Sequence, residues 1–172
     1  PAFVLAAWAL LLVPAAGGAV WGLIDAPVAA GLIPAEFQSA ADPPPEGRDF
    51  DAETASAFSF AVMFNNIQVT FMAFAGGITF GALTVWALVF NGLILGVIGG
   101  LAVDAGNGLA FLRLVSSHGP LEISCIVVGG VAGLRVGWAL VHPGPLRRVT
   151  ALRREARPAV ELAAGTAPWL VL

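Results

Sequence analysis

The sequence has little charge, and none of its positive charge comes from lysine. Only 11% of the 172 residues are charged, whereas 58% are hydrophobic and the mean hydropathy is +0.88. Soluble domains have about 25% charged residues and about 45–50% apolar ones, so this composition excludes an ordinary soluble domain. The single cysteine, Cys125, excludes an internal disulfide. The short alternating segments of a membrane β-barrel are also missing.

Long apolar runs recur along the chain instead, and several are long enough to cross a hydrocarbon core about 30 Å thick. We therefore predict an all-α, polytopic transmembrane helix bundle of about five spans, the last one truncated, with additional interfacial helices. The lipid bilayer is its first expected partner. The chain opens on Pro1 within an apolar run and closes on another apolar run, so we expect it to be the ordered part of a longer protein.

Composition shifts divide the chain into five expected segments. They are a first transmembrane span (1–24), an acidic, proline-rich extracytoplasmic loop (25–54), a helical membrane core (55–142), a cytoplasmic arginine-rich connector (143–160) and the start of a final span (161–172).

The membrane core is too long for one helix and must reverse direction. Because Asn and Gly accept turn dihedrals cheaply, we predict a reversal at Asn91-Gly92, after an interfacial helix over 55–66 and a second span over 67–90. The third span begins at Gly92, either as a half-span or as a full span reaching Leu114. We expect the fourth to begin at Pro120 and end near Val141.

Arginines gather near the end of the chain, and acidic residues gather after the first span. Arginines beside a span mark its cytoplasmic side, which predicts that the acidic loop lies outside and that the arginines do not bind a nucleic-acid partner. Arg135 should snorkel to the interface, although a contact with Asp104 or with an anionic lipid is also open. The expected interfacial basic residues are Arg135, Arg147, Arg148, Arg153, Arg154 and Arg157.

Glycines repeat at four-residue intervals in three spans. Such rows let helix backbones approach closely in a membrane, where van der Waals contact holds them together. The rows favour packing within one bundle, and a homodimer is the alternative. The residues are Gly77, Gly81, Gly92, Gly96, Gly100, Gly129, Gly133 and Gly137.

His118 and Glu122 flank Gly119-Pro120. We interpret Glu122 as a capping carboxylate, because Pro favours the first position of a helix and Glu the third. The alternative is a proton or transport site, in which Asn66, Asp104, His118 and Glu122 line a cavity at similar outer depth. No catalytic, cofactor-binding or metal residue is expected, and the sequence has no phosphate loop or catalytic triad; we predict that the protein is not an enzyme.

Two stretches carry a resemblance to a known family: NNIQVTFMAFAGGITFGALTVWALVFNGLILG (65–96) and HGPLEISCIVVGGVAGLRVGWALVHPG (118–144). Their order and motifs resemble the stage II sporulation protein M family over roughly residues 58–172. The motif residues at matching positions are Asn65, Asn66, Asn91, Gly92, His118, Gly119 and Glu122.

The resemblance implies a non-enzymatic, multi-pass scaffold of the bacterial inner membrane. It would anchor or organise envelope-remodelling, peptidoglycan-degrading partners, as the family's namesake does. It assigns no catalytic role to the motif residues. The alternative function is a transporter or channel component. A scaffold should have a dry, closely packed bundle, whereas a conduit needs a polar cavity that reaches the bilayer midplane.

Overall fold

The computed structural model describes residues 1–37 and 52–170, which are helical or in short connections, without a strand in either range. The predicted features of residues 38–51, nearly half of the acidic loop expected over 25–54, lie outside the described residues. The elements are α1 (Ala2–Ile24), α2 (Ala26–Ala30), η1 (Ala35–Phe37), α4 (Ala52–Ala75), η2 (Gly76–Thr79), α5 (Ala82–Asp104), α6 (Gly108–Val141), α7 (Arg148–Thr166) and η3 (Ala167–Leu170).

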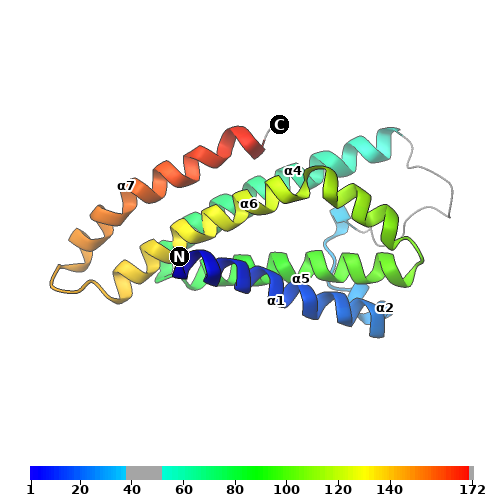
Figure 1. Cartoon of the computed structure of the whole chain (residues 1–172), viewed down its shortest axis with the longest axis horizontal. Helices are drawn as coiled ribbons and strands as arrows, with labels where there is room; N and C mark the ends of the chain where they lie inside the picture. The colour runs from blue at the N-terminus through cyan, green and yellow to red at the C-terminus, as the bar shows by residue number, and fades with distance from the viewer. Residues whose placement is uncertain (38–51, 171–172) are drawn as a thin grey trace.

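The bundle is elongated, and its long helices run along one axis in alternating directions (Figure 1). Four helical segments of the described chain are long and apolar enough to cross a membrane: Ala2–Ile24, Phe60–Thr79, Ala82–Asp104 and Gly119–Val141. The expectation of an all-helical membrane protein is confirmed. The fifth span stays a prediction.

The predicted reversal at Asn91-Gly92 is wrong, as is the division of 55–90 into an interfacial helix and a span. One helix, α4, covers Ala52–Ala75, and the chain turns at Phe80 and Gly81, whose φ angles are 58° and 84°. Two successive left-handed residues reverse the chain, and glycine adopts that conformation without strain. The third span therefore begins at Ala82 and reaches full length at Asp104.

The candidate span Gly119–Val141 matches the expected fourth span, but the helix start predicted at Pro120 is wrong. Helix α6 begins at Gly108 and passes through Pro120 to Val141, so His118 lies within the helix rather than before it. Membrane helices tolerate an internal proline where neighbouring helices compensate the lost backbone bond, and the helix commonly bends there. The N-terminal part of α6 changes direction in Figure 1, whereas its end at Val141, before His142-Pro143, lies where the sequence placed it.

Helices α1 and α5 lie in backbone contact. A methyl group placed on Gly92, Gly96 or Gly100 would overlap a carbonyl oxygen of α1, and the three oxygens belong to Leu11, Ala15 and Ala19. The three glycines of α5 and the three carbonyl groups of α1 both recur every four residues, which is about one helical turn. The contact is reciprocal: a methyl group on Gly22 would lie 2.8 Å from the carbonyl oxygen of Val97. No side chain fits between the two helices along this seam.

A second close contact joins α6 to α4 and to the turn that follows it. A methyl group on Gly129 would lie 2.6 Å from the carbonyl oxygen of Thr70, and one on Gly137 would lie 2.6 Å from the backbone nitrogen of Gly81. The buried Thr84 hydroxyl donates to the carbonyl oxygen of Ala73 at 2.7 Å, which aligns α5 with α4 at this level. Helix α6 is the centre of the bundle, because it contacts α1, α4, α5 and α7.

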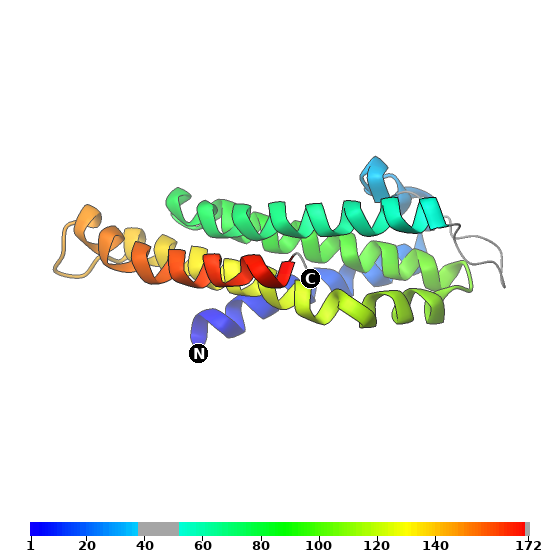
Figure 2. The same cartoon turned by 90° about the horizontal axis from the view of Figure 1, so that it is seen from above.

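Helix α7 folds back along α6 instead of extending away from it, as both views of the bundle show (Figures 1 and 2). Its alanine face is buried, with Ala159 packed against Ala132 and Val136 of α6. At its far end, the Cys125 sulfur of α6 lies 3.9 Å from the carbonyl oxygen of Thr166. The helix thus lies beside the fourth candidate span rather than along a flat interface.

Candidate functional site

Four polar side chains from three helices meet inside the bundle; we call Asn65, Asn66, Asn91 and Glu122 the amide–carboxylate cluster. The Nδ2 of Asn66 donates to Oε2 of Glu122 at 2.7 Å, joining α4 to α6. The Nδ2 of Asn65 lies 3.4 Å from Oδ1 of Asn91 on α5 and 3.4 Å from Oδ1 of Asn66. A short polar network therefore links residues up to 56 positions apart in sequence.

The members of the cluster lie at different depths of three candidate spans. Asn91 is nine residues from the start of α5 and thirteen from its end, or about 14 Å and about 20 Å along the helix axis. Asn91 therefore lies well inside its candidate span, whereas Glu122 lies three residues from the start of the Gly119–Val141 segment. Asn66 is 8% exposed even without lipid around the bundle, so the other helices, rather than lipid, surround its amide.

A cavity of about 100 Å³ lies beside the cluster. Its polar lining comes from the cluster itself, and its apolar lining includes Phe37, Ile98, Phe111 and Ile123. Among the described lining residues, Glu122 is the only ionisable one. The arrangement therefore offers one carboxylate and three amides, whose oxygens accept and whose N–H groups donate. The described residues hold no group of three His, Cys, Asp or Glu side chains that suits a metal ion.

The interpretation of Glu122 as a helix cap is wrong, because α6 has already run fourteen residues when it reaches Glu122. Its partner is a side chain of another helix rather than a backbone N–H at a helix start. The expected set of Asn66, Asp104, His118 and Glu122 is brought together only in part. Asp104 is exposed at the end of α5, away from the cluster, and the side chain of His118 is outside the described part of the structure.

Asn65 and Asn91 were expected in other places, in an interfacial helix over 55–66 and in a turn. They join the cluster because the chain turns ten residues before Asn91, so that α4 and α5 run antiparallel with the two asparagines at the same level. The sequence contained a signal for this position of Asn91. A membrane-spanning helix of 23 residues that ends at Asp104 begins at Ala82, and Asn91 then lies inside the helix.

A second polar site lies at the opposite end of the fourth candidate span, where α6 and α7 diverge. Arg135 donates from Nε and from one terminal nitrogen to Oε2 of Glu155, at 3.2 and 2.8 Å. The structure thus pairs Arg135 with Glu155, whereas the sequence suggested that Arg135 snorkels to the interface or contacts Asp104 or lipid. Sequence reasoning missed Glu155, because its pairing with Arg135 depends on α7 folding back.

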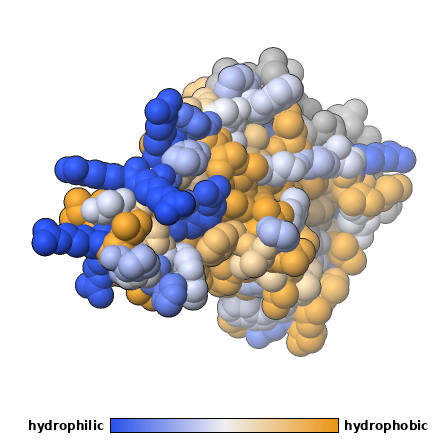
Figure 3. Space-filling model, turned by 60° about the vertical axis from the view of Figure 1, so that its left-hand side comes forward, coloured by the Kyte–Doolittle hydropathy of each residue, from blue (hydrophilic) through white to orange (hydrophobic). Residues whose placement is uncertain are grey.

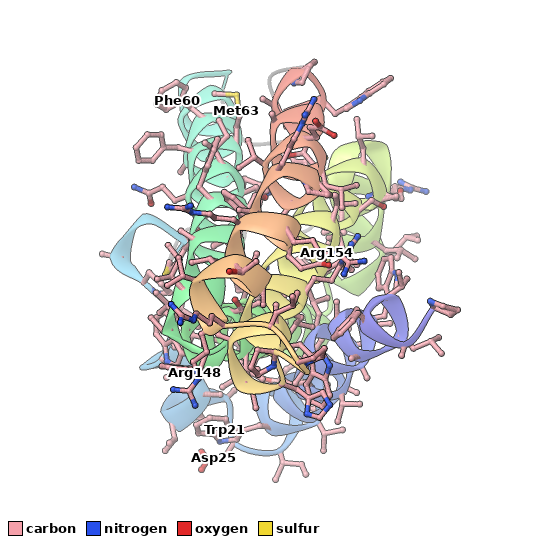
Figure 4. All side chains as sticks on the ribbon, turned by 90° about the vertical axis from the view of Figure 1, so that its left-hand side faces the viewer. Trp21, Asp25, Phe60, Met63, Arg148 and Arg154 are labelled. Carbon is pink, nitrogen blue, oxygen red and sulfur yellow. The ribbon has the colours of Figure 1, made fainter. Side chains whose placement is uncertain are left out.

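A groove of about 300 Å³ adjoins this pair and includes Trp138, His142 and Arg154 in its lining. The ring centroids of Trp138 and His142 lie 5.6 Å apart. Seen from this end, Arg148 and Arg154 lie on opposite sides of α7 (Figure 4), and the Arg148 guanidinium lies 6.0 Å from the centroid of the Phe80 ring. Hydrophilic side chains gather on one side of the surface in Figure 3, beside a largely hydrophobic remainder.

Comparison with known proteins decides the family. The family model of stage II sporulation protein M matches residues 2–172. The chain belongs to the stage II sporulation protein M family. The match includes α1, which the motif resemblance over 58–172 had covered only by position.

An uncharacterized protein of the archaeon Methanocaldococcus jannaschii is a relative of this chain, and the two sequences are 37% identical over 81 residues. The aligned part is 46% of this chain and 46% of the relative, so the chain spans about half the length of the curated relative it matches. No solved structure matches the chain.

Proposed function

We propose that this family member is a non-enzymatic membrane scaffold that organises partner proteins of the cell envelope. The observation that carries the proposal is the charged face of α7, which lies beside a candidate span. Arg157 and Glu161 form an exposed ion pair at 3.0 Å, with side chains 89% and 65% exposed. Ala159, between them in sequence, packs against α6 well inside the Gly119–Val141 segment.

The charged face of α7 is poorly suited to contact with lipid. Charged side chains at membrane depth are costly and usually face protein or water. A partner helix or a second copy of the chain would cover the α7 face and satisfy its charges. The close seams between α1 and α5 and between α4 and α6 support the same proposal, because small-residue packing at the backbone makes a rigid platform. In this proposal the glycine rows stabilise the single bundle, and a homodimer is one form the covering partner takes.

The orientation follows from charge. With the arginine-rich end on the cytoplasmic side, the acidic segment after α1 faces outward in a bacterial inner membrane. Envelope-remodelling, peptidoglycan-degrading enzymes are then the proposed partners on that outer side, as the family's namesake suggests.

The test is crosslinking in native membranes with the full-length protein. A photoreactive residue at Arg157 should crosslink to a defined protein partner, and an envelope enzyme should copurify with the complex. A photoreactive residue at Val13, an exposed apolar position on α1, is the matched control and should crosslink mainly to lipid. Crosslinking to lipid at both positions, with no envelope enzyme recovered, would refute the scaffold.

A second candidate function is a transport component, and the amide–carboxylate cluster favours it. A part-buried Asn66–Glu122 contact beside a cavity is a typical feature of polar sites inside transporters. Ion flux into liposomes that depends on Glu122, and that Glu122→Gln abolishes without loss of folded protein, would replace the scaffold with this function. Absence of flux in the wild-type protein would remove the candidate.

A further inference from the structure

The amide–carboxylate cluster has an unbalanced charge. Glu122 carries the only ionisable group among the described residues that line its cavity, and its described hydrogen-bond donor, the Asn66 amide, is neutral. Glu122 is part-buried and lies on a candidate span, where a charged group is costly unless an opposite charge accompanies it. A counter-charge is therefore the missing part of this site.

The described arginines do not supply that charge. Arg135 lies on the same helix thirteen residues away, about 20 Å along the axis, and is already paired with Glu155 at 2.8 Å. Arg113 is exposed and lies nine residues away in the other direction, about 14 Å along the helix. The compensating charge must come from outside the described side chains.

The donor set indicates which ion fits. Carboxylate and amide oxygens are ligands for hard cations and do not select soft metals such as zinc or copper. One carboxylate balances one positive charge, so a monovalent cation gives a neutral site, whereas a divalent cation leaves an excess charge in the membrane. Asn66 occupies one acceptor position of Glu122, and a carboxylate has about four.

The space also fits a small ion. A cavity of about 100 Å³ lies against the cluster, and a water molecule takes about 30 Å³, so the cavity has room for a largely dehydrated cation with one or two waters. The amide oxygens of Asn65 and Asn91 can each turn a lone pair toward such an ion, because rotation of a terminal amide exchanges its oxygen and nitrogen. Asn66 keeps its N–H on Glu122 and has a second lone pair on Oδ1 for the ion.

We propose that Glu122 and the three asparagine amides bind a monovalent metal cation of the size of Na⁺ inside the bundle. The ion neutralises Glu122 and ties α4, α5 and α6 together. This binding is independent of the scaffold function, because it requires neither a protein partner nor passage of the ion across the membrane.

The test is thermal unfolding of the full-length protein, purified in detergent with choline chloride as the only salt. Replacing choline chloride by NaCl at constant ionic strength should raise the Tm by several degrees in a saturable manner. Glu122→Gln, which keeps the shape of the side chain and removes its charge, should abolish the response. Asn91→Ala should shift the half-saturating NaCl concentration upward at least tenfold and so tests the site without altering Glu122.

The control variant is Glu161→Gln, which removes an exposed carboxylate of α7 and should keep the full response to NaCl. A response to KCl or LiCl as well as NaCl supports a monovalent site of broader selectivity. Equal Tm values in NaCl and choline chloride would refute the proposal. So would a response confined to MgCl₂, or an unchanged NaCl response in both Glu122→Gln and Asn91→Ala.

Discussion

Substituting Gly96 by alanine tests whether the α1–α5 contact holds the bundle together. A methyl group there would overlap the carbonyl oxygen of Ala15 and would lie 2.7 Å from its carbonyl carbon and 2.8 Å from its Cα. Carbon atoms pack at about 3.5–4.0 Å, so the helices must separate by roughly 1 Å along the seam. The clash involves backbone atoms, which cannot rotate away as a side chain can.

The expected cost follows from these contacts. Overpacking costs about 1–3 kcal/mol, and the rigid backbone here favours the upper end. Replacing glycine by alanine within a helix returns about 1 kcal/mol, which leaves a net destabilisation of about 2 kcal/mol. For a chain of this size 1 kcal/mol corresponds to about 2–4 °C, so the Tm should fall by about 4–8 °C.

Gly17→Ala is the matched control, because Gly17 lies in α1, the other helix of the seam, yet a methyl group there meets nothing within 4 Å. It should raise the Tm by about 2–4 °C through the same helix-propensity gain of about 1 kcal/mol. The assay is thermal unfolding of the two purified variants in one detergent, followed by circular dichroism. Shifts of the same sign and size in both variants would refute the packing argument.

Two further predictions concern α7. Arg135→Gln should lower the free energy of unfolding by no more than about 1 kcal/mol. The side chains of Arg135 and Glu155 are 35% and 28% exposed, and solvent weakens partly exposed ion pairs. A loss above about 3 kcal/mol in chemical denaturation would show that the pair is fully buried. Cys125, which is buried under the end of α7, should react slowly with a maleimide and at least tenfold faster after α7 is deleted. Equal labelling rates would show that α7 does not cover it.

Composition and run length were sufficient to predict a helical membrane bundle, because a hydrophobic stretch of fixed length has few alternatives in a membrane. The same reasoning failed at the turns. Asn91-Gly92 has the composition of a reversal, yet Gly92 lies against the Leu11 carbonyl and Asn91 joins the cluster. Local propensity cannot anticipate such tertiary uses, because they depend on which helix becomes the neighbour.

The candidate site was predictable in its residues and not in its geometry. Asn65, Asn66, Asn91 and Glu122 stand out as polar groups in apolar runs, and an intramembrane polar group is a functional candidate by default. Their meeting depends on the register of α4 against α5 and on α6 continuing through Pro120. Both features arise from packing between helices, so neither is encoded in a local pattern.

The central claim is that Asn66 and Glu122 form a site inside the bundle, and a double-mutant cycle measures it most directly. Asn66→Leu, Glu122→Leu and the double variant are unfolded under identical conditions. Residues in direct contact should show a coupling energy of about 1–3 kcal/mol. The double variant should be less destabilised than the sum of the single ones, because each single change leaves a buried or part-buried polar group without its partner. Additive effects within about 0.5 kcal/mol would place the two residues apart and contradict the site.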